Sequence, residues 1–261
     1  MANSPSGESV IHRAIRILSV FGPQTQSRGL REIARETELP VSTVHRILNE
    51  LEAEGVVIRD LNGKWMHGHR LWEIASRGAE ASDLRKAALP PMEDLVQALH
   101  VHISLSVLDG TDALYVERLA PDELVVNITE VAGRLPAHAC SAGLTLTAFG
   151  SVEQQDLMLR RRLDKLTDQT IVDPHELRRV FARIRHEGYA AMEGIIVPES
   201  SGVSVPVYGD HGTVIAALTV IRPRGEEDLN AVVPQLRFAS RATSRRLGVR
   251  LDAPRVRRLM G

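Results

Sequence analysis

The residues with the clearest capacity for chemistry lie between positions 42 and 51, where polar and apolar side chains recur at helical spacing. The apolar positions fall at i, i+3, i+4 and i+7, which predicts an amphipathic helix that buries them. They are Val44, Ile47, Leu48 and Leu51, and the polar side chains on the opposite face are Ser42, Thr43, His45, Arg46 and Asn49. Such side chains hydrogen-bond to phosphates and base edges, and a guanidinium such as that of Arg46 can bind guanine O6 and N7 together. The pattern therefore predicts a helix that contacts double-stranded DNA in the major groove.

The segments around this helix are those that a DNA-reading helix needs. A helix over 9–21, capped by Ser9, is followed by a short helix over 30–37 and a sharp turn that ends at Pro40. A β-hairpin comes next, with strands over 56–58 and 64–66 around an Asn-Gly pair that favours a type I′ turn. Arg59 and Lys64 lie near its tip, where the wing of a winged helix-turn-helix grips phosphates. The alternatives are a helix with a merely solvated polar face and a ribbon that only caps the helical core.

The charge balance limits this interpretation. The formal net charge is −1, and residues 1–68 contain eight Lys or Arg and eight Asp or Glu. Because phosphate contacts usually dominate affinity for DNA, the prediction depends on where the charges lie rather than on their sum. The acids Glu50, Glu52 and Glu54 come after the part of the helix that is expected to enter the groove.

Composition also bears on the compartment. The single cysteine, Cys140, excludes an internal disulfide framework and fits a reducing cytoplasm. No run approaches the roughly 18 apolar residues needed to span a bilayer, and the polar first nine residues lack the apolar region of a signal peptide. We expect a cytoplasmic protein with no membrane partner.

The chain is long enough for two domains. We expect a disordered leader over 1–8, a winged helix-turn-helix over 9–68, a linker helix over 69–82, a second domain over 83–249 and a basic tail over 250–261. Trp72 on the linker helix would pack against the same helix of a second subunit, which matches a palindromic operator, or else within its own chain. The arginine-rich end of the chain could contact DNA, an acidic neighbour such as Glu226-Glu227-Asp228, or another subunit; the alternative is a solvated helix face and tail.

The second domain shows alternating strand and helix patterns. Helices are expected over 91–99, 141–149, 153–161, 175–187 and 226–247, and strands over 102–108, 113–119, 124–130, 189–193, 202–208 and 214–221, with 132–136 as a loop. Hairpins alternating with helix blocks predict an α+β domain with an antiparallel sheet.

Three stretches carry a resemblance to a known family. They are LREIARETELPVSTVHRILNELEAEG, GRLPAHACSAGLTLTAF and VSVPVYGDHGTVIAALTVIRP. In their order and spacing, over nearly the whole chain, the sequence resembles the IclR family of transcriptional regulators. The resemblance implies a winged helix-turn-helix joined by a linker helix to a GAF-like effector-binding domain. It further implies dimers, often paired into tetramers, that repress or activate catabolic operons when a small organic acid or aromatic metabolite binds, with no cofactor.

The same resemblance implies an effector site between one helix start and the last strands of the sheet. The helix start contributes Cys140, Ser141 and Ala142, and the strand positions are Met192, Gly202, Ser204, Thr219 and Ile221. Free N–H groups at the helix start suit a carboxylate. Because Gly202, Ile221 and Met192 depart from the family's polar pattern, we expect a ligand with a hydrophobic or aromatic body. The alternative is that these residues simply pack.

Other chemistries are possible for the histidines and the cysteine. His100 and His102 would share one face if both lay on a strand, and with His138 and Cys140 they could bind a metal ion in a metal-sensing regulator. Cys140 near a helix start could instead be a redox-sensitive thiol. A Cys140–His138 nucleophile would make the chain an enzyme fused to a DNA-binding domain, but proximity in sequence gives no catalytic geometry. We therefore expect no catalytic residues and no bound metal.

Overall fold

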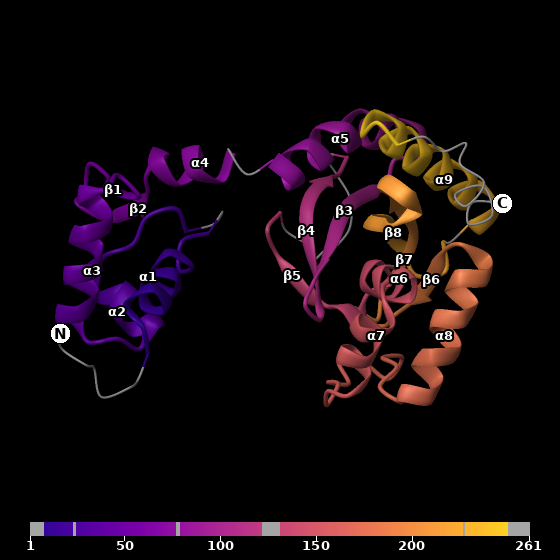
Figure 1. Cartoon of the computed structure of the whole chain (residues 1–261), viewed down its shortest axis with the longest axis horizontal. Helices are drawn as coiled ribbons and strands as arrows, with labels where there is room; N and C mark the ends of the chain where they lie inside the picture. The colour runs from indigo at the N-terminus through magenta and orange to yellow at the C-terminus, as the bar shows by residue number, and fades with distance from the viewer. Residues whose placement is uncertain (1–7, 23–24, 77–78, 122–130, 227, 250–261) are drawn as a thin grey trace. The chain divides into compact units, whose positions relative to one another are not determined.

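The computed structural model describes residues 8–22, 25–76, 79–121, 131–226 and 228–249. The chain forms two compact units, unit 1 over Met1–Ala79 and unit 2 over Glu80–Gly261. Figure 1 shows the elements of both units.

Unit 1 is a small helical domain with one hairpin. Its elements are α1 (Val10–Leu18), α2 (Leu30–Thr37), α3 (Val41–Ala53), β1 (Val57–Arg59), β2 (Trp65–His67) and α4 (His69–Ser76). One core joins the three helices to the hairpin, and it contains Ile17, Phe21, Ile33, Ala34, Val44, Ile47, Leu48, Val57 and Trp65. The apolar positions that the periodicity assigned to the inner face of α3 thus lie in this core.

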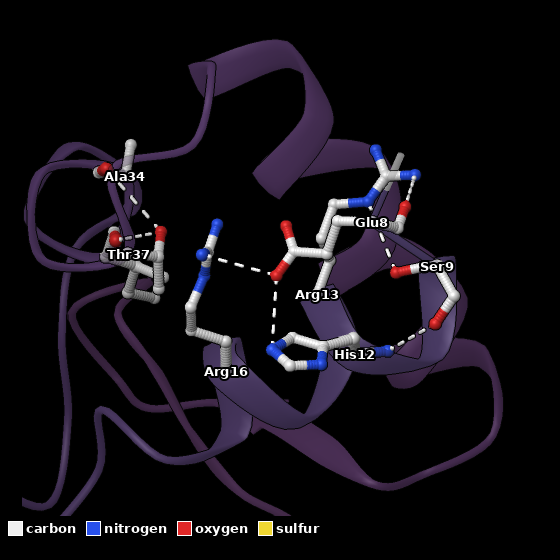
Figure 2. A network of polar contacts seen from close by, with 8 residues as sticks. Glu8, Ser9, His12, Arg13, Arg16, Ala34 and Thr37 are labelled. Atoms are coloured by element: carbon white, nitrogen blue, oxygen red, sulfur yellow. Dashed lines mark hydrogen bonds and ion pairs between the residues drawn. The ribbon is translucent and has the colours of Figure 1, made fainter. Parts of the chain in front are cut away.

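Polar contacts at the start of α1 fix how that helix begins. The Ser9 hydroxyl accepts a hydrogen bond from the His12 N–H at 3.1 Å, as an N-cap does. The Glu8 carboxylate lies 3.3 Å from His12 Nε2 and 3.3 Å from Arg16 Nη1, between the two side chains in Figure 2. The buried Arg13 side chain donates to the Glu8 carbonyl at 3.1 Å.

The corner between α2 and α3 depends on one left-handed residue. Glu38 ends α2 with φ 52°, and the Leu39 N–H turns back to the Ala34 carbonyl at 3.2 Å. Pro40 then caps α3, where its missing N–H costs nothing. The chain therefore turns sharply between the two helices, as the sequence predicted.

The hairpin turn differs from the predicted type I′ turn. Gly63 has φ 72°, but Asn62 is not among the described residues with positive φ. The Gly63 N–H donates to the Asp60 carbonyl at 3.0 Å, and Asp60 pairs with Lys64 across the loop. This is a three-residue loop closed by a left-handed glycine. The Asp60 carboxylate sets this loop, because it accepts hydrogen bonds from the backbone N–H groups of both Asn62 and Lys64. The hydrogen bond from the Lys64 N–H lowers the pKa of the Asp60 carboxyl.

In the described residues, unit 2 is built on one antiparallel sheet of six strands. The strands are β3 (His102–Asp109), β4 (Asp112–Leu119), β5 (Arg134–Pro136), β6 (Ala190–Glu193), β7 (Ser200–Tyr208) and β8 (Val214–Pro223), in the order β5-β4-β3-β8-β7-β6. The helices are α5 (Ala79–Leu99), α6 (Ser141–Phe149), α7 (Val152–Leu159), α8 (Pro174–Glu187) and α9 (Leu229–Arg246), with 3-10 turns η1 (Ala137–Ala139) and η2 (Asp210–Gly212). The predicted α+β class with an antiparallel sheet is confirmed.

The two faces of this sheet differ in chemistry. One face is aliphatic, and helices α5 and α9 lie over it side by side (Figure 1). Its strand residues include Ile103, Leu105, Val203, Val205, Leu218 and Val220. The alternate residues point to the other face, which is covered by α6 and carries small or polar side chains such as Ser104, Gly202, Ser204 and Thr219.

Helix α5 begins well before the predicted start at residue 91. It runs through Pro90 and Pro91, which cannot donate backbone hydrogen bonds. Leu84, Ala88 and Met92 on both sides of the prolines pack into the aliphatic core, so burial holds the helix together across them. The predicted linker helix over 69–82 corresponds to α4, which ends at Ser76, and to the first residues of α5. None of the described helices is apolar over a length that would cross a bilayer.

Other elements differ from their predicted bounds by a few residues. Residues 134–136, expected in a loop, form β5 by pairing with β4. The strand expected over 124–130 lies outside the described residues, as do most of the leader and the basic tail.

Gly143 allows α6 to approach η1, and this close contact gives a test of the fold. A Cβ at position 143 would lie 2.2 Å from Ala137 Cα and 2.4 Å from the Ala137 carbonyl oxygen. We predict that Gly143→Ala lowers the free energy of unfolding by about 1–3 kcal/mol, measured by urea unfolding followed by circular dichroism. Gly22→Ala is the control, because nothing lies within 4 Å of its added Cβ. An unchanged urea midpoint for Gly143→Ala would contradict this account of the α6 contact.

Candidate functional site

The outward face of α3 is a polar surface on unit 1. Ser42, His45, Arg46 and Asn49 are exposed and Thr43 is partly exposed. The structure therefore brings the five predicted DNA-contacting residues of this helix to one surface, with the core residues Val44 and Ile47 behind them.

Arg46 already has a partner on its own helix. Its Nη1 lies 2.7 Å from Glu50 Oε1, and both side chains are more than half exposed. An exposed pair at this spacing stabilises a helix by only about 0.2–0.5 kcal/mol. Since DNA offers a guanidinium stronger partners, this ion pair leaves Arg46 available for base contact.

The two predicted wing residues lie in different surroundings. The Arg59 guanidinium lies 3.9 Å from the centre of the Trp65 ring, and its Nε is 3.3 Å from Glu52 Oε1. Arg59 thus ties the hairpin to α3, which sequence spacing did not reveal. The Lys64 side chain is exposed near the turn.

Unit 2 contains a pocket on the α6 side of its sheet. The pocket encloses about 480 Å³ of space not filled by atoms, part of it open to solvent. Its lining residues come from β4 to β8, from the start of α6 and from the loop after β6; they are Tyr115, Leu135, Cys140, Ser141, Met192, Ile195, Ile196, Val197, Ser200, Ser201, Gly202, Thr219 and Ile221. Six of these residues have apolar side chains, which are those of Leu135, Met192, Ile195, Ile196, Val197 and Ile221. None of the lining residues carries a formal charge.

Most of the predicted effector-site residues meet in this pocket. Cys140, Ser141, Met192, Gly202, Thr219 and Ile221 line it. Ala142 packs instead in a core cluster with Tyr115, and Ser204 accepts a hydrogen bond from Thr219 at 3.0 Å.

Sequence reasoning missed Tyr115, Leu135, the 195–197 loop, Ser200 and Ser201. The pairing of β4 beside β3 brings Tyr115 to the pocket, and no local pattern in the sequence gives that pairing.

The hydroxyl groups of the pocket differ in whether they are free. Ser200 donates to the Val197 carbonyl at 3.1 Å, Ser201 to the Arg222 carbonyl at 3.5 Å, and Thr219 to Ser204. Ser141 is buried, and its hydroxyl has no hydrogen-bond partner among the described residues. It stands at the first residue of α6, where backbone N–H groups favour an anion.

Cys140 and Tyr115 form a second polar feature of the lining. Burial raises the pKa of the Cys140 thiol to about 11, against smaller lowering effects from the Gly143 N–H and the Tyr115 hydroxyl. Burial also raises the pKa of Tyr115, and its interaction with Cys140 adds to the increase. Both groups are therefore uncharged near neutral pH. The thiol accepts a hydrogen bond from the Gly143 N–H at 3.4 Å and so caps α6.

The structure gives no support to the metal and nucleophile alternatives. Within the described part of the chain, no three His, Cys, Asp or Glu side chains are grouped so that they could hold a metal ion. His100 and His102, which could bind a metal together only if both lay on a strand, do not share one, because His100 has φ 51° after α5 and only His102 lies on β3. His138 Nε2 lies 2.9 Å from the Asp164 carbonyl oxygen, so that nitrogen is directed away from Cys140.

Two family models match the two units. The model described as the IclR helix-turn-helix domain matches residues 10–61, and the model described as the bacterial transcriptional regulator IclR C-terminal domain matches residues 77–245. The chain belongs to the IclR family of transcriptional regulators. The resemblance seen in the three sequence stretches is confirmed, and so is the predicted fold, a helix-turn-helix followed by an α/β effector domain.

Curated relatives of this IclR-family regulator cover most of its length. The HTH-type transcriptional regulator XynR of Escherichia coli K12 is 28% identical over 91% of this chain and 96% of its own. The HTH-type transcriptional repressor AllR of the same strain is 25% identical over 94% and 92%. The Pca regulon regulatory protein of Pseudomonas putida is 25% identical over 83% and 75%. These relatives are named as regulators.

Solved structures are similar over the same extent. An IclR homolog of Microbacterium hydrocarbonoxydans, crystallised in complex with 4-hydroxybenzoate, is 37% identical with a TM-score of 0.86, over 92% of this chain and 99% of that one. The IclR of Thermotoga maritima, at 22% identity, has a TM-score of 0.73 over 91% and 98% and shares the fold.

The exposed face of α3 gives a test of DNA reading. Arg46→Ala should weaken binding to the operator by about 1–3 kcal/mol, roughly 5- to 150-fold, and leave binding to random DNA nearly unchanged. Lys64→Ala should instead weaken both equally and reduce the slope of log affinity against log salt by about one. Fluorescence anisotropy on labelled duplexes measures both effects.

Glu50→Gln is the matched control, because it removes the negative charge beside Arg46 and keeps the guanidinium. It should bind the operator at least as tightly as the wild type. If Arg46→Ala binds the operator like the wild type, α3 does not read bases through Arg46.

The raised pKa of Cys140 predicts an unreactive thiol. With a pKa of about 11, only about one thiol in a thousand is ionised at pH 8, and the thiolate is the reactive form. We expect the native protein to react with a disulfide reagent at pH 8 far more slowly than the urea-unfolded protein, in which the pKa returns to its ordinary value. Equal rates would reinstate a redox-sensing role for Cys140.

Proposed function

We propose that this IclR-family regulator controls a catabolic operon in response to an aromatic carboxylic acid that binds in the pocket of unit 2. Binding of the acid changes the affinity of the regulator for a palindromic operator. The observation that carries the proposal is the pocket itself, which combines apolar walls with the Ser141 hydroxyl at the start of α6.

The lining of the pocket favours a ligand with one polar end. Met192, Ile195, Ile196 and Ile221 offer apolar surface to a ring. The carboxylate end fits the start of α6, where the Ser141 hydroxyl and the N-terminal N–H groups can donate to it. Because the Gly143 N–H already donates to Cys140, the backbone N–H groups of Ser141 and Ala142 are the candidates for binding the carboxylate. The 37% identical homolog from Microbacterium, complexed with 4-hydroxybenzoate, supports an acid of this kind.

The proposed binding to the operator depends on α3 and on dimerisation. The exposed polar face of α3 supports base contact through Arg46, with Ser42, Thr43, His45 and Asn49 around it and Lys64 on the phosphates. Trp72 and Ile74 on α4 are 73% and 54% exposed, and apolar side chains of this size support burial against a second subunit. We infer a dimer, or a tetramer of two dimers, on a two-fold operator.

The proposal predicts a response to aromatic acids and not to their uncharged analogues. Purified protein is titrated onto DNA from upstream of its own and neighbouring genes, with benzoate, 4-hydroxybenzoate, benzamide or acetate present. We expect one of the two aromatic acids to change operator affinity at least fivefold, and the amide and acetate to have little effect, because α6 favours an anion and the walls favour a ring.

Isothermal titration with the protein alone measures the same ligands without DNA. Binding of acid to the protein without any change on the operator would contradict regulation by this ligand. If neither aromatic acid binds at millimolar concentration, the assignment of the ligand class is wrong.

A further inference from the structure

One row of paired residues across the sheet has a glycine where both its neighbours carry large side chains that face the pocket. Met192 on β6 pairs with Gly202 on β7, and Gly202 pairs with Ile221 on β8. Paired residues in neighbouring antiparallel strands point to the same face. All three line the pocket, so a glycine stands between two large apolar side chains.

The space above Gly202 is occupied from the side of α6. A Cβ added at position 202 would lie 2.4 Å from Ser141 Oγ, 3.4 Å from Ser141 Cβ and 3.9 Å from Thr219 Cγ2. The first distance is too short for two unbonded atoms, whereas the other two are ordinary contacts. A side chain at 202 would therefore displace the Ser141 hydroxyl specifically.

Backbone conformation does not explain this glycine. Gly202 is in the middle of a regular strand and is not among the described residues with positive φ, so its backbone would accept other residues. A glycine inside a strand weakens it and often marks a close approach of another group. Here that group is the Ser141 side chain.

We infer that Gly202 determines ligand specificity in this regulator. Its missing side chain keeps the Ser141 hydroxyl in the pocket, where it donates to the carboxylate of a monocyclic aromatic acid. The ring of that acid packs on the apolar side chains of Met192 and Ile221. The inference rests on the proposed function and adds the residue that positions the hydroxyl for the ligand.

A double-mutant cycle tests the link between Gly202 and Ser141. Gly202→Ala should weaken binding of the aromatic acid that binds the wild type at least tenfold. Ser141→Ala should also weaken it, because one hydrogen bond to the carboxylate is lost. In the double variant the added methyl has room, so Gly202→Ala should cost less than threefold when Ser141 is already alanine. Isothermal titration calorimetry on the full-length protein gives the four affinities.

A second measurement tests whether the apolar walls beside Gly202 select a flat ring. Wild-type protein is titrated with benzoate and with cyclohexanecarboxylate, which has the same carboxylate on a thicker ring. We expect benzoate to bind at least tenfold more tightly. Equal affinities would contradict packing of a flat ring between these walls. Equal losses from Gly202→Ala with and without the Ser141 hydroxyl would overturn the role of Gly202 through Ser141.

Controls separate this inference from the proposed function and from misfolding. The circular dichroism spectrum and the cooperativity of urea unfolding should show that all three variants are folded. If the wild type binds neither aromatic acid, the proposed function fails. If the wild type binds an aromatic acid and Gly202→Ala binds it equally well, only the inference about Gly202 fails.

Discussion

The alternation of side chains along β7 and β8 is the constraint on which the rest of unit 2 depends. Both strands lie inside the sheet and are covered on both faces, so each successive residue must suit a different layer. The odd positions of β7, such as Val203 and Val205, build the aliphatic core under α5 and α9. The even positions, such as Gly202 and Ser204, face α6. Small side chains there let a short helix come close to the sheet.

The close approach of α6 both makes the pocket and limits it. Gly143 places the helix against Ala137, and Gly202 makes room for Ser141 at the helix start. The pocket is what remains beside this contact, at the edge where the start of α6 meets β7, β8 and the loop after β6. Its polar groups are therefore few, and their places are set by backbone geometry. A site of this kind distinguishes ligands by shape and by one anionic end more than by charge pairing.

Unit 1 follows a different principle. The core of α1, α2, α3 and the hairpin fixes the orientation of α3, but the side chains on its outer face are held only by weak, exposed contacts. Arg46 rests on Glu50, while Arg59 is held between Glu52 and Trp65. Helix α3 is thus rigid in its backbone and adaptable at its surface, as the proposed contact with DNA requires.

The sequence by itself determined the family, the α+β class and the outward face of α3. Each of these depends on local periodicity or on a contiguous motif, which a single chain displays directly. It also named six of the thirteen residues that line the pocket, through the family resemblance. Local patterns failed in α5, where burial against the sheet carries a helix through two prolines. They also failed at the hairpin, where the nearby Asp60 carboxylate rather than the Asn-Gly pair sets the turn. Only the tertiary structure decided that Tyr115 joins the pocket, that His100 and His102 do not share a strand, and that Gly202 lies under Ser141. Each of these depends on strand pairing or on helix packing between residues far apart in the chain, and such contacts leave no periodic trace in the sequence.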